Sequence, residues 1–414
     1  MNAISETGTA GFLARYGAAK GRLPGDSTLR AAAADAFRTL GLPGTMRGRR
    51  SEAWKYTTLQ PLGGMSFRAE EPDFKASPRH GADQWLNFRA GRFVPGSSSS
   101  VPGFTRFSDT PDFGELSWPD RDPMVALNTM LAEDGAVLTV PPNRDVGLVY
   151  LSQFGIDGTS AHPRHMIRLG KGARLTLIDM SLGEGCYLQN PVTEIHVADG
   201  AVLTHVRVQN DSVDAFHMAT IYAAVAAGGT YDSFTLNVGG RITRTEIHAR
   251  LDGPGAIAHL NGAQLLTGSQ HADFTSVVRH SGAKGTSRQT IKNVLAGHSR
   301  GVFQGRIEVA RGAQGTDGYQ MNRALLLSPD AEIDTKPELE IFADDVKCSH
   351  GATVGELDAE QLFYLRSRGI PDSEARSILV RAFLAEALDP VTNDTARGLL
   401  EDAVARWWEG QAAC

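Results

Sequence analysis

The sequence predicts a mainly β protein, with a parallel β-helix core flanked by an N-terminal and a C-terminal α-helical region. From Leu138 onward, short β-rich runs alternate with glycine turns, and helical periodicity is absent for roughly two hundred residues. In this stretch a glycine followed by a small residue recurs at intervals of 26–30 residues, a spacing typical of stacked repeats. Apolar residues at helical spacing occur near both ends of the chain.

The glycine pairs mark the expected repeats. Each repeat would hold one or two strands, which are too small to bury an apolar face alone, so neighbouring repeats must stack. Because no helices interrupt the strands, a doubly wound sheet is disfavoured, and a β-helix is favoured over a β-sandwich. Chance recurrence is the competing interpretation, since the chain contains 45 glycines. The pairs are Gly172-Ala173, Gly200-Ala201, Gly229-Thr230, Gly255-Ala256, Gly282-Ala283 and Gly312-Ala313.

The N-terminal region is predicted to contain an early helix. Ser27 can cap this helix, its apolar positions follow a spacing of 3–4 residues, and Gly41 and Pro43 end it. Residues 61–123 show little periodicity, so no element is assigned to them. The N-terminal helical and irregular region is therefore expected to span residues 1–137.

The C-terminal region is predicted to be helical again. A capping box formed by Asp358 and Gln361 begins one helix, and a second helix with an apolar stripe follows the break at Pro371. The parallel β-helix core is therefore expected at residues 138–353, and a C-terminal helical domain at residues 354–414.

Composition and charge exclude several classes of protein. Lys and Arg total 41 and Asp and Glu total 47, and a net charge of −6 disfavours a broad nucleic-acid-binding surface. No run of about 18 apolar residues is present, so no membrane span is expected. The N-terminus lacks the basic start and apolar run of a secretory signal. Cys186, Cys348 and Cys414 are too few for a disulfide framework and are expected to be thiols, which favours the cytoplasm.

Sequence motifs give little support for catalysis. Neither a phosphate-binding loop nor a dinucleotide-binding glycine motif is present, so ATP hydrolysis by this chain is not expected. Residues 297–301 (GHSRG) match the G-x-S-x-G elbow of serine hydrolases. That elbow needs a helix after it, whereas residues 302–309 are typical of a strand. These glycines are therefore assigned to β turns, and no catalytic residue is assigned.

Cys348 and His350 are the candidate metal ligands. They follow Asp344 and Asp345, and thiolate, imidazole and carboxylate groups this close in sequence can ligate iron or zinc. In an extended segment the side chains of Cys348 and His350 point to the same side. From spacing alone, a buried thiol beside a surface histidine is the favoured interpretation. A cubane cluster usually takes four cysteine thiolates, so a cluster here would need ligands from a second chain.

Three segments resemble the SufB/SufD family of iron–sulfur cluster assembly proteins. They are residues 49–57 (RRSEAWKYT), 344–353 (DDVKCSHGAT) and 362–370 (LFYLRSRGI), and the second is the most specific. The resemblance implies a right-handed parallel β-helix and a non-catalytic scaffold subunit of the Suf system, which contributes to iron acquisition and nascent cluster assembly. The length of the chain and the C-S-H-G-A-T string resemble the SufD branch of the family.

The resemblance also implies partners and a site. A SufB-like paralogue would pair through the β core, a SufC-like ATPase would dock on the C-terminal helices, and a homodimer is possible for the isolated chain. His350 matches the family histidine at the subunit interface, which is proposed to hold iron or the nascent cluster, and Cys348 lies beside it. No cofactor is expected in the isolated chain, only a transient cluster or iron shared with SufB. The candidate docking residues are Leu362, Phe363, Ile378, Leu379 and Phe383.

Two other functions stay open at this point. The first is a secreted-type β-helix enzyme that binds polysaccharides, which would need clustered aromatic and acidic residues and a secretory signal. The second is a stand-alone metal-dependent hydrolase that uses His162, His165 and His350. Metal content of the isolated chain and turnover of generic esters would distinguish the second function from a scaffold.

Overall fold

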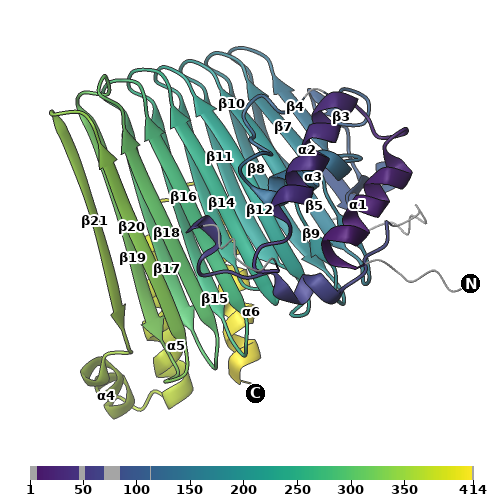
Figure 1. Ribbon diagram of the computed structural model, residues 1–414. Coiled ribbons are helices and arrows are strands. Elements are labelled where there is room, and N and C mark those ends of the chain that lie inside the picture. Colours follow the sequence, from purple (N-terminus) through teal and green to yellow (C-terminus); the bar gives the residue numbers. More distant parts are fainter. Residues whose placement is uncertain (1–6, 46–51, 70–83, 112, 413–414) are drawn as a thin grey trace, which may run out of the picture.

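The protein is built around a long β-solenoid. The computed structural model describes residues 7–45, 52–69, 84–111 and 113–412. The solenoid consists of a 10-stranded and an 11-stranded sheet, and the chain crosses from one sheet to the other as it winds along the axis (Figure 1). The predicted mainly β fold, with a parallel β-helix core between N-terminal and C-terminal helices, is confirmed.

The first sheet contains ten strands. Across the sheet these are β2 (Arg92–Phe93), β1 (Trp85–Arg89), β5 (Asp145–Gly155), β8 (Arg174–Gly183), β11 (Val202–Asn210), β13 (Thr230–Asn237), β15 (Ile257–Leu266), β17 (Thr286–Leu295), β19 (Thr316–Leu326) and β21 (Val346–Gly355).

The second sheet contains eleven strands. Its main path is β20 (Glu332–Ile341), β18 (Arg300–Val309), β16 (His271–His280), β14 (Ile242–Leu251), β12 (Phe216–Val225), β10 (Val192–Val197), β7 (Arg164–Leu169), β4 (Ala136–Val140) and β3 (Phe104–Arg106), with β6 (Ser160–Ala161) and β9 (Leu188–Gln189) beside it.

Helices precede, interrupt and follow the strands. The α-helices are α1 (Gly8–Ala19), α2 (Ser27–Leu40), α3 (Pro123–Leu131), α4 (Ala359–Ser367), α5 (Asp372–Leu388) and α6 (Asp394–Ala412), and the short 3-10 helices are η1 (Glu52–Trp54), η2 (Gln60–Gly64) and η3 (Pro95–Ser97).

Turns between coils explain why glycine and alanine recur in the sequence. Gly172 and Gly200 have φ angles of 65° and 62°, a region that glycine adopts without steric cost. The alanines that follow them, Ala173 and Ala201, are buried in the core between the sheets. Gly255 and Ala256 show the same arrangement, whereas at the third predicted pair the positive φ falls on Gly228, one residue before Gly229.

The main core lies between the two sheets. Leu177 and Leu203 from the first sheet meet Ile221 and Ile247 from the second in one continuous apolar cluster. Strands β8, β11 and β13 are paired in parallel, so equivalent side chains of successive coils lie side by side. Stacking therefore buries the apolar surface that a single coil would leave in water.

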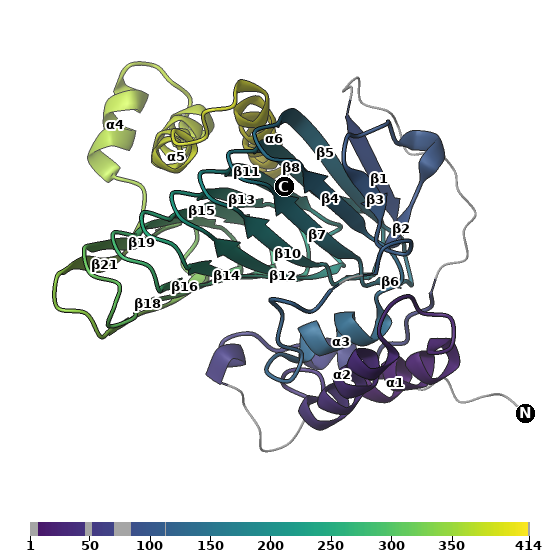
Figure 2. The same cartoon turned by 90° about the horizontal axis from the view of Figure 1, so that it is seen from above.

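The N-terminal helices cover the outer face of the second sheet (Figure 2). Phe37 of α2 and Leu127 of α3 pack in one cluster with Phe216 of β12. Helix α2 lies where the sequence predicts a helix, but its N-cap is Asp26 and not Ser27. The backbone N–H of Thr28 donates to the Asp26 carboxylate at 2.7 Å, because Ser27 is already the first helical residue.

Strands β1, β2 and β3 lie in a stretch to which no element was assigned from sequence. Strand β1 pairs in parallel with β5 and antiparallel with β2, while β3 pairs antiparallel with β4. These short strands continue both sheets at the first coil. The partners β5 and β4 of strands β1 and β3 are distant in sequence, and β2 has only two residues, so local periodicity does not reveal these strands.

The C-terminal helices cover the outer face of the first sheet, opposite the N-terminal helices (Figure 2). Leu384 of α5 packs in one cluster with Leu265 of β15. Glu386 of α5 also pairs with Lys292 at 2.6 Å and with Arg323 at 2.7 Å. Apolar packing and two ion pairs therefore hold α5 against the sheet.

Strands β20 and β21 form the open end of the solenoid. Among the described strands, β20 pairs in its sheet only with β18, and β21 only with β19. The outer edges of both strands therefore carry backbone groups without ladder partners. The side chains of Phe342 and Val354 are exposed at this end.

Residues 297–301 form a turn that leads into strand β18, and not a hydrolase elbow. Gly297 has a φ of 66°, and strand β18 follows where the elbow would need a helix. Gly297 therefore lies in a turn as predicted, whereas Gly301 lies in strand β18, so the assignment to a turn is confirmed for the first glycine and wrong for the second.

Two other sequence expectations concern cysteines and membranes. Cys186 and Cys348 are free thiols. Cys414 and residues 49–51 of the first family-like segment lie outside the described residues. Within the described ranges, no helix combines the length and apolar composition that a membrane span requires.

Two buried histidines are expected to make folding stability depend on pH. Burial lowers the pKa of His165 and of His280 to about 4. The Ala136 N–H donates to Nδ1 of His165 at 3.0 Å, so this nitrogen must be unprotonated. An unfolded histidine takes up a proton near pH 6.5, so the unfolded chain binds more protons between pH 6.5 and 4. The free energy of unfolding should therefore fall as pH is lowered through this range, by up to about 3 kcal/mol per histidine.

Urea denaturation at several pH values between about 7 and 5 measures this dependence. A His280→Gln variant should show a flatter pH dependence than the original chain. His298 lies on the surface, so His298→Gln is the matched control and should leave the dependence unchanged. An unchanged slope in His280→Gln would contradict the assignment.

Candidate functional site

His350 lies on the edge strand of the solenoid. It sits in the middle of β21, where its Cα faces that of Gln320 on β19 and its side chain is exposed. Strand β21 forms because it pairs in parallel with β19 over ten residues, as each earlier strand of this solenoid sheet pairs with the strand one coil before it. The single imidazole is therefore presented at the open end of the solenoid, where it can donate a nitrogen ligand to a metal ion.

Cys348 is a half-buried thiol and not an exposed ligand. It packs against the small apolar cluster that contains Ile307 and Ala343, and its neighbour across the sheet is Gly318. Burial raises the pKa of the Cys348 thiol, which disfavours the thiolate that binds metals. Alternation along β21 turns Cys348 and His350 toward the same face, but the final turns of the solenoid cover only Cys348.

The described residues do not gather a complete metal site around His350. No group of three or more His, Cys, Asp or Glu side chains that could hold a metal ion occurs among them. His162 and His165 lie near the other end of the solenoid, since β6 and β7 are early strands and β21 is the last. His162 is buried against the ring of Phe12. The structure therefore does not bring together the three histidines considered for a metal-dependent hydrolase.

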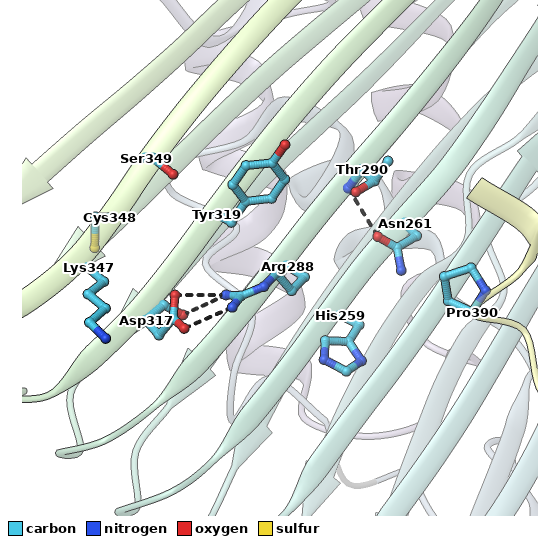
Figure 3. A pocket seen from close by; sticks show the side chains of 10 residues that line it. All are labelled: His259, Asn261, Arg288, Thr290, Asp317, Tyr319, Lys347, Cys348, Ser349 and Pro390. Carbon is cyan, nitrogen blue, oxygen red and sulfur yellow. Dashed lines mark hydrogen bonds and ion pairs between the residues drawn. The ribbon is translucent and has the colours of Figure 1, made fainter. Parts of the chain in front are cut away.

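A polar groove next to β21 was not foreseen from the sequence. This sheet-face groove has a volume of about 670 Å³ and lies on the outer face of the first sheet, between β15, β17, β19, β21 and the turn after α5 (Figure 3). Its lining includes His259, Arg288, Tyr319, Lys347, Cys348 and Ser349. Four of these occupy one row across the sheet at intervals of about one coil, which is the sequence signal that could have located them.

The C-terminal helices carry an exposed apolar groove. Asp358 caps helix α4, and its carboxylate accepts the N–H groups of Glu360 and Gln361. This is the Asp358 half of the predicted capping box. A groove of about 830 Å³ lies between α4 and α5. We call it the helical groove; its apolar lining includes Phe363, Tyr364, Leu365, Ile378 and Leu379.

The five candidate docking residues do not all lie in the helical groove. Phe363, Ile378 and Leu379 line it, whereas Leu362 does not. Phe383 faces the β core, where the Lys292 ammonium lies 4.4 Å from the centre of its ring. Tyr364 is a groove residue that the sequence analysis missed, although it is an exposed aromatic residue next to Phe363.

Fold and site together define a β-solenoid protein. It has helices on both outer faces and an exposed histidine, His350, on the edge strand at its open end. Residues 153–383 match the family model described as "SUF system FeS cluster assembly, SufBD core domain". The matched segment begins at the end of β5 and contains β21, all of α4 and most of α5.

Curated relatives agree with this match. The chain is 32% identical to the iron-sulfur cluster assembly protein SufD of Escherichia coli, over 86% of this chain and 88% of that protein. It is 33% identical to an iron-sulfur cluster assembly SufBD family protein of Synechocystis, over 67% and 64% of the two chains. It is also 33% identical to the chloroplastic protein ABCI7 of Arabidopsis thaliana, over 69% and 62%. The chain belongs to the SufBD family, and these relatives support a role in iron–sulfur cluster assembly.

Proposed function

We propose that this chain is a SufD-like, non-enzymatic scaffold subunit of a cytoplasmic Suf machinery. In this proposal it pairs with a SufB-like paralogue, docks a SufC-like ATPase, and contributes to iron acquisition and nascent cluster assembly. The observation that carries the proposal is the exposed imidazole of His350 on β21, the edge strand of a SufBD-core solenoid. Iron or the cluster is cargo here, and it would be held only while it is assembled.

The open end of the solenoid supports the pairing. A second solenoid could extend both sheets through the free edges of β20 and β21, because unpaired strand edges readily add another strand. Phe342 and Val354 are exposed there and would add apolar contacts. Pairing at this end would place His350 at the junction of the two chains.

The donor chemistry supports a shared site. One imidazole and one half-buried thiol cannot supply the ligands of a cubane cluster, which usually takes four thiolates. Ligands from the paralogue would complete the set at the junction. Because burial disfavours the Cys348 thiolate, His350 is the ligand we assign to this chain and Cys348 has a smaller role.

Substitution of His350 tests the proposal. In a deletion strain grown under iron limitation, His350→Ala is expected to lower cluster formation about tenfold, the scale at which altered ligation changes metal-site function. Folding and co-purification of the paralogue and the ATPase should be preserved, because the imidazole is exposed. Cys348→Ala should have a smaller effect. Activity of a cluster-dependent enzyme, with co-purification as the assembly check, measures both.

His298 provides the matched control, since it is an exposed histidine in a turn away from β21. His298→Ala should complement the deletion fully. Full complementation by His350→Ala as well would show that this histidine is structural, and the proposed role would be wrong. Absence of any paralogue or ATPase in the co-purification would count against the scaffold assignment itself.

A further inference from the structure

The last coil of the solenoid is acidic, whereas the two coils beneath it are basic. Residues 328–355, which include β20 and β21, contain seven acidic and two basic residues, a net charge of −5 against −6 for the whole chain. Residues 299–327 contain four basic and two acidic residues, and residues 270–298 contain four and one. The sign of the charge therefore reverses at the open end.

The basic coil beneath neutralises only part of this negative charge. Arg300 of β18 donates to Asp334 of β20 at 2.8 Å, and Arg306 lies 3.3 Å from Glu340. These arginine–carboxylate pairs link the last coil to the coil beneath it across adjacent strands. The remaining carboxylates of the last coil are available to a molecule that covers the open end.

Two of the remaining carboxylates lie in the turn between β20 and β21, the last strands of the solenoid (Figure 1). Asp344 and Asp345 are exposed and form no ion pair with any residue that the structure describes. The backbone N–H of Asp345 donates to Oε1 of Gln314 at 2.9 Å, and its carbonyl accepts the N–H of Gly315 at 2.7 Å. The coil beneath therefore fixes the backbone of this turn, while both carboxylates stay in solvent.

We propose that the open end selects a partner whose facing coil carries net positive charge, and that it discriminates against a second copy of this chain. Two copies would bring two coils of net charge −5 together, and like charges across an interface suppress pairing. A basic coil on the partner would instead continue the stacking of this chain, in which the acidic coil already lies on a basic one. The inference rests on the proposed pairing at the open end, and it adds the chemical character of the surface that pairs there.

Sedimentation velocity of the purified full chain, alone and mixed with its SufB-like paralogue, tests this inference at 0.1 M and 1 M NaCl. The Debye length falls from about 10 Å to about 3 Å between these concentrations, so exposed charges on facing coils are largely screened at the higher one. We expect 1 M NaCl to weaken the pairing with the paralogue by about tenfold and to strengthen self-association of the chain by about the same factor.

The double variant Asp344→Asn with Asp345→Asn removes two of the charges at constant salt concentration. At 0.1 M NaCl it should bind the paralogue about tenfold more weakly than the original chain, because each lost ion pair contributes up to about 1 kcal/mol. The same variant should self-associate more strongly, since less repulsion remains. Salting-out cannot cause either change, because the salt concentration is the same. Circular dichroism should be unchanged, because both side chains are exposed.

Glu184 and Asp199 supply the matched control, because both are exposed carboxylates in loops of the early coils. Glu184→Gln with Asp199→Asn should behave as the original chain does. The inference is overturned if the chain stays monomeric at 1 M NaCl, if salt leaves either affinity unchanged or changes both in the same direction, or if the two double variants behave alike. Self-association needs no paralogue, so it tests this inference even if the paralogue fails to bind, which would contradict the proposed function.

Discussion

A chain in which Phe363 and Ile378 are both replaced by aspartate is expected to lose its SufC-like ATPase while keeping its solenoid. Phe363 is 73% exposed and Ile378 is 39% exposed, and both line the helical groove. Large apolar side chains are seldom left this exposed together unless a partner covers them. The two aspartates would replace two apolar side chains that we expect to be buried in the interface with the ATPase. A buried apolar interface residue of this kind contributes about 2 kcal/mol or more to the free energy of binding. A combined loss of about 4 kcal/mol corresponds to a weakening of the ATPase affinity by about 700-fold or more.

Affinity purification of the tagged chain from its native cells, with identification of the proteins that accompany it, provides the measurement. Val213 is an exposed apolar residue in the turn before β12, so Val213→Asp is the matched control and should retain the ATPase. Circular dichroism of the double variant should keep its β signal, because α4 and α5 pack outside the solenoid. Undiminished recovery of the ATPase with the double variant would refute the docking surface.

Replacement of Arg244 by methionine is expected to cause the largest loss of stability among single substitutions in the β core. The guanidinium, 2% exposed, pairs with Glu246 at 2.8 Å and with Asp273, and it stacks 4.5 Å from the ring centre of Trp54. Methionine would fill much of the space, but it would leave the buried Asp273 carboxylate without its cation and Glu246 with only the imidazole of His248. Breaking a buried pair in this way costs about 3–5 kcal/mol.

Urea denaturation of the two chains at neutral pH measures this loss. Arg250→Met is the matched control, because Arg250 lies on the same strand but pairs with Asp252 at the surface. An exposed pair contributes about 0–1 kcal/mol, so the control should change little. Similar free energies of unfolding for the two variants would contradict the assignment of Arg244 as the central cation of this cluster.

The solenoid could be predicted from the sequence because its determinants are local and repeated. A glycine with positive φ followed by a buried alanine, as at Gly172 and Gly200, is a short pattern that each coil needs again. Strands β1 and β3 could not be predicted this way, because they pair with β5 and β4 far along the chain, and β2 has only two residues, too few to show a pattern. The cap of α2 was misplaced by one residue, since Asp26 and Ser27 are both good capping residues.

The candidate site could be predicted only in part. Alternation along β21 places Cys348 and His350 on one face, but it does not say which of them is covered. That depends on Ile307, which β18 brings beneath the thiol from an earlier coil. Likewise, helical periodicity predicts an apolar stripe on α5, but not that Phe383 packs under Lys292 while Ile378 stays exposed.

The free edges of β20 and β21 have a consequence for the amount of this chain that can accumulate in a cell without aggregating. A solenoid that ends without a terminal cap exposes a template on which other strands can assemble, and repeat proteins normally depend on such caps for solubility. Molecules made in excess of whatever covers this end would therefore meet one another and form end-to-end aggregates. Under the proposed pairing, synthesis of this chain would have to be matched in amount to synthesis of the paralogue, which would favour co-regulated expression and rapid removal of the surplus.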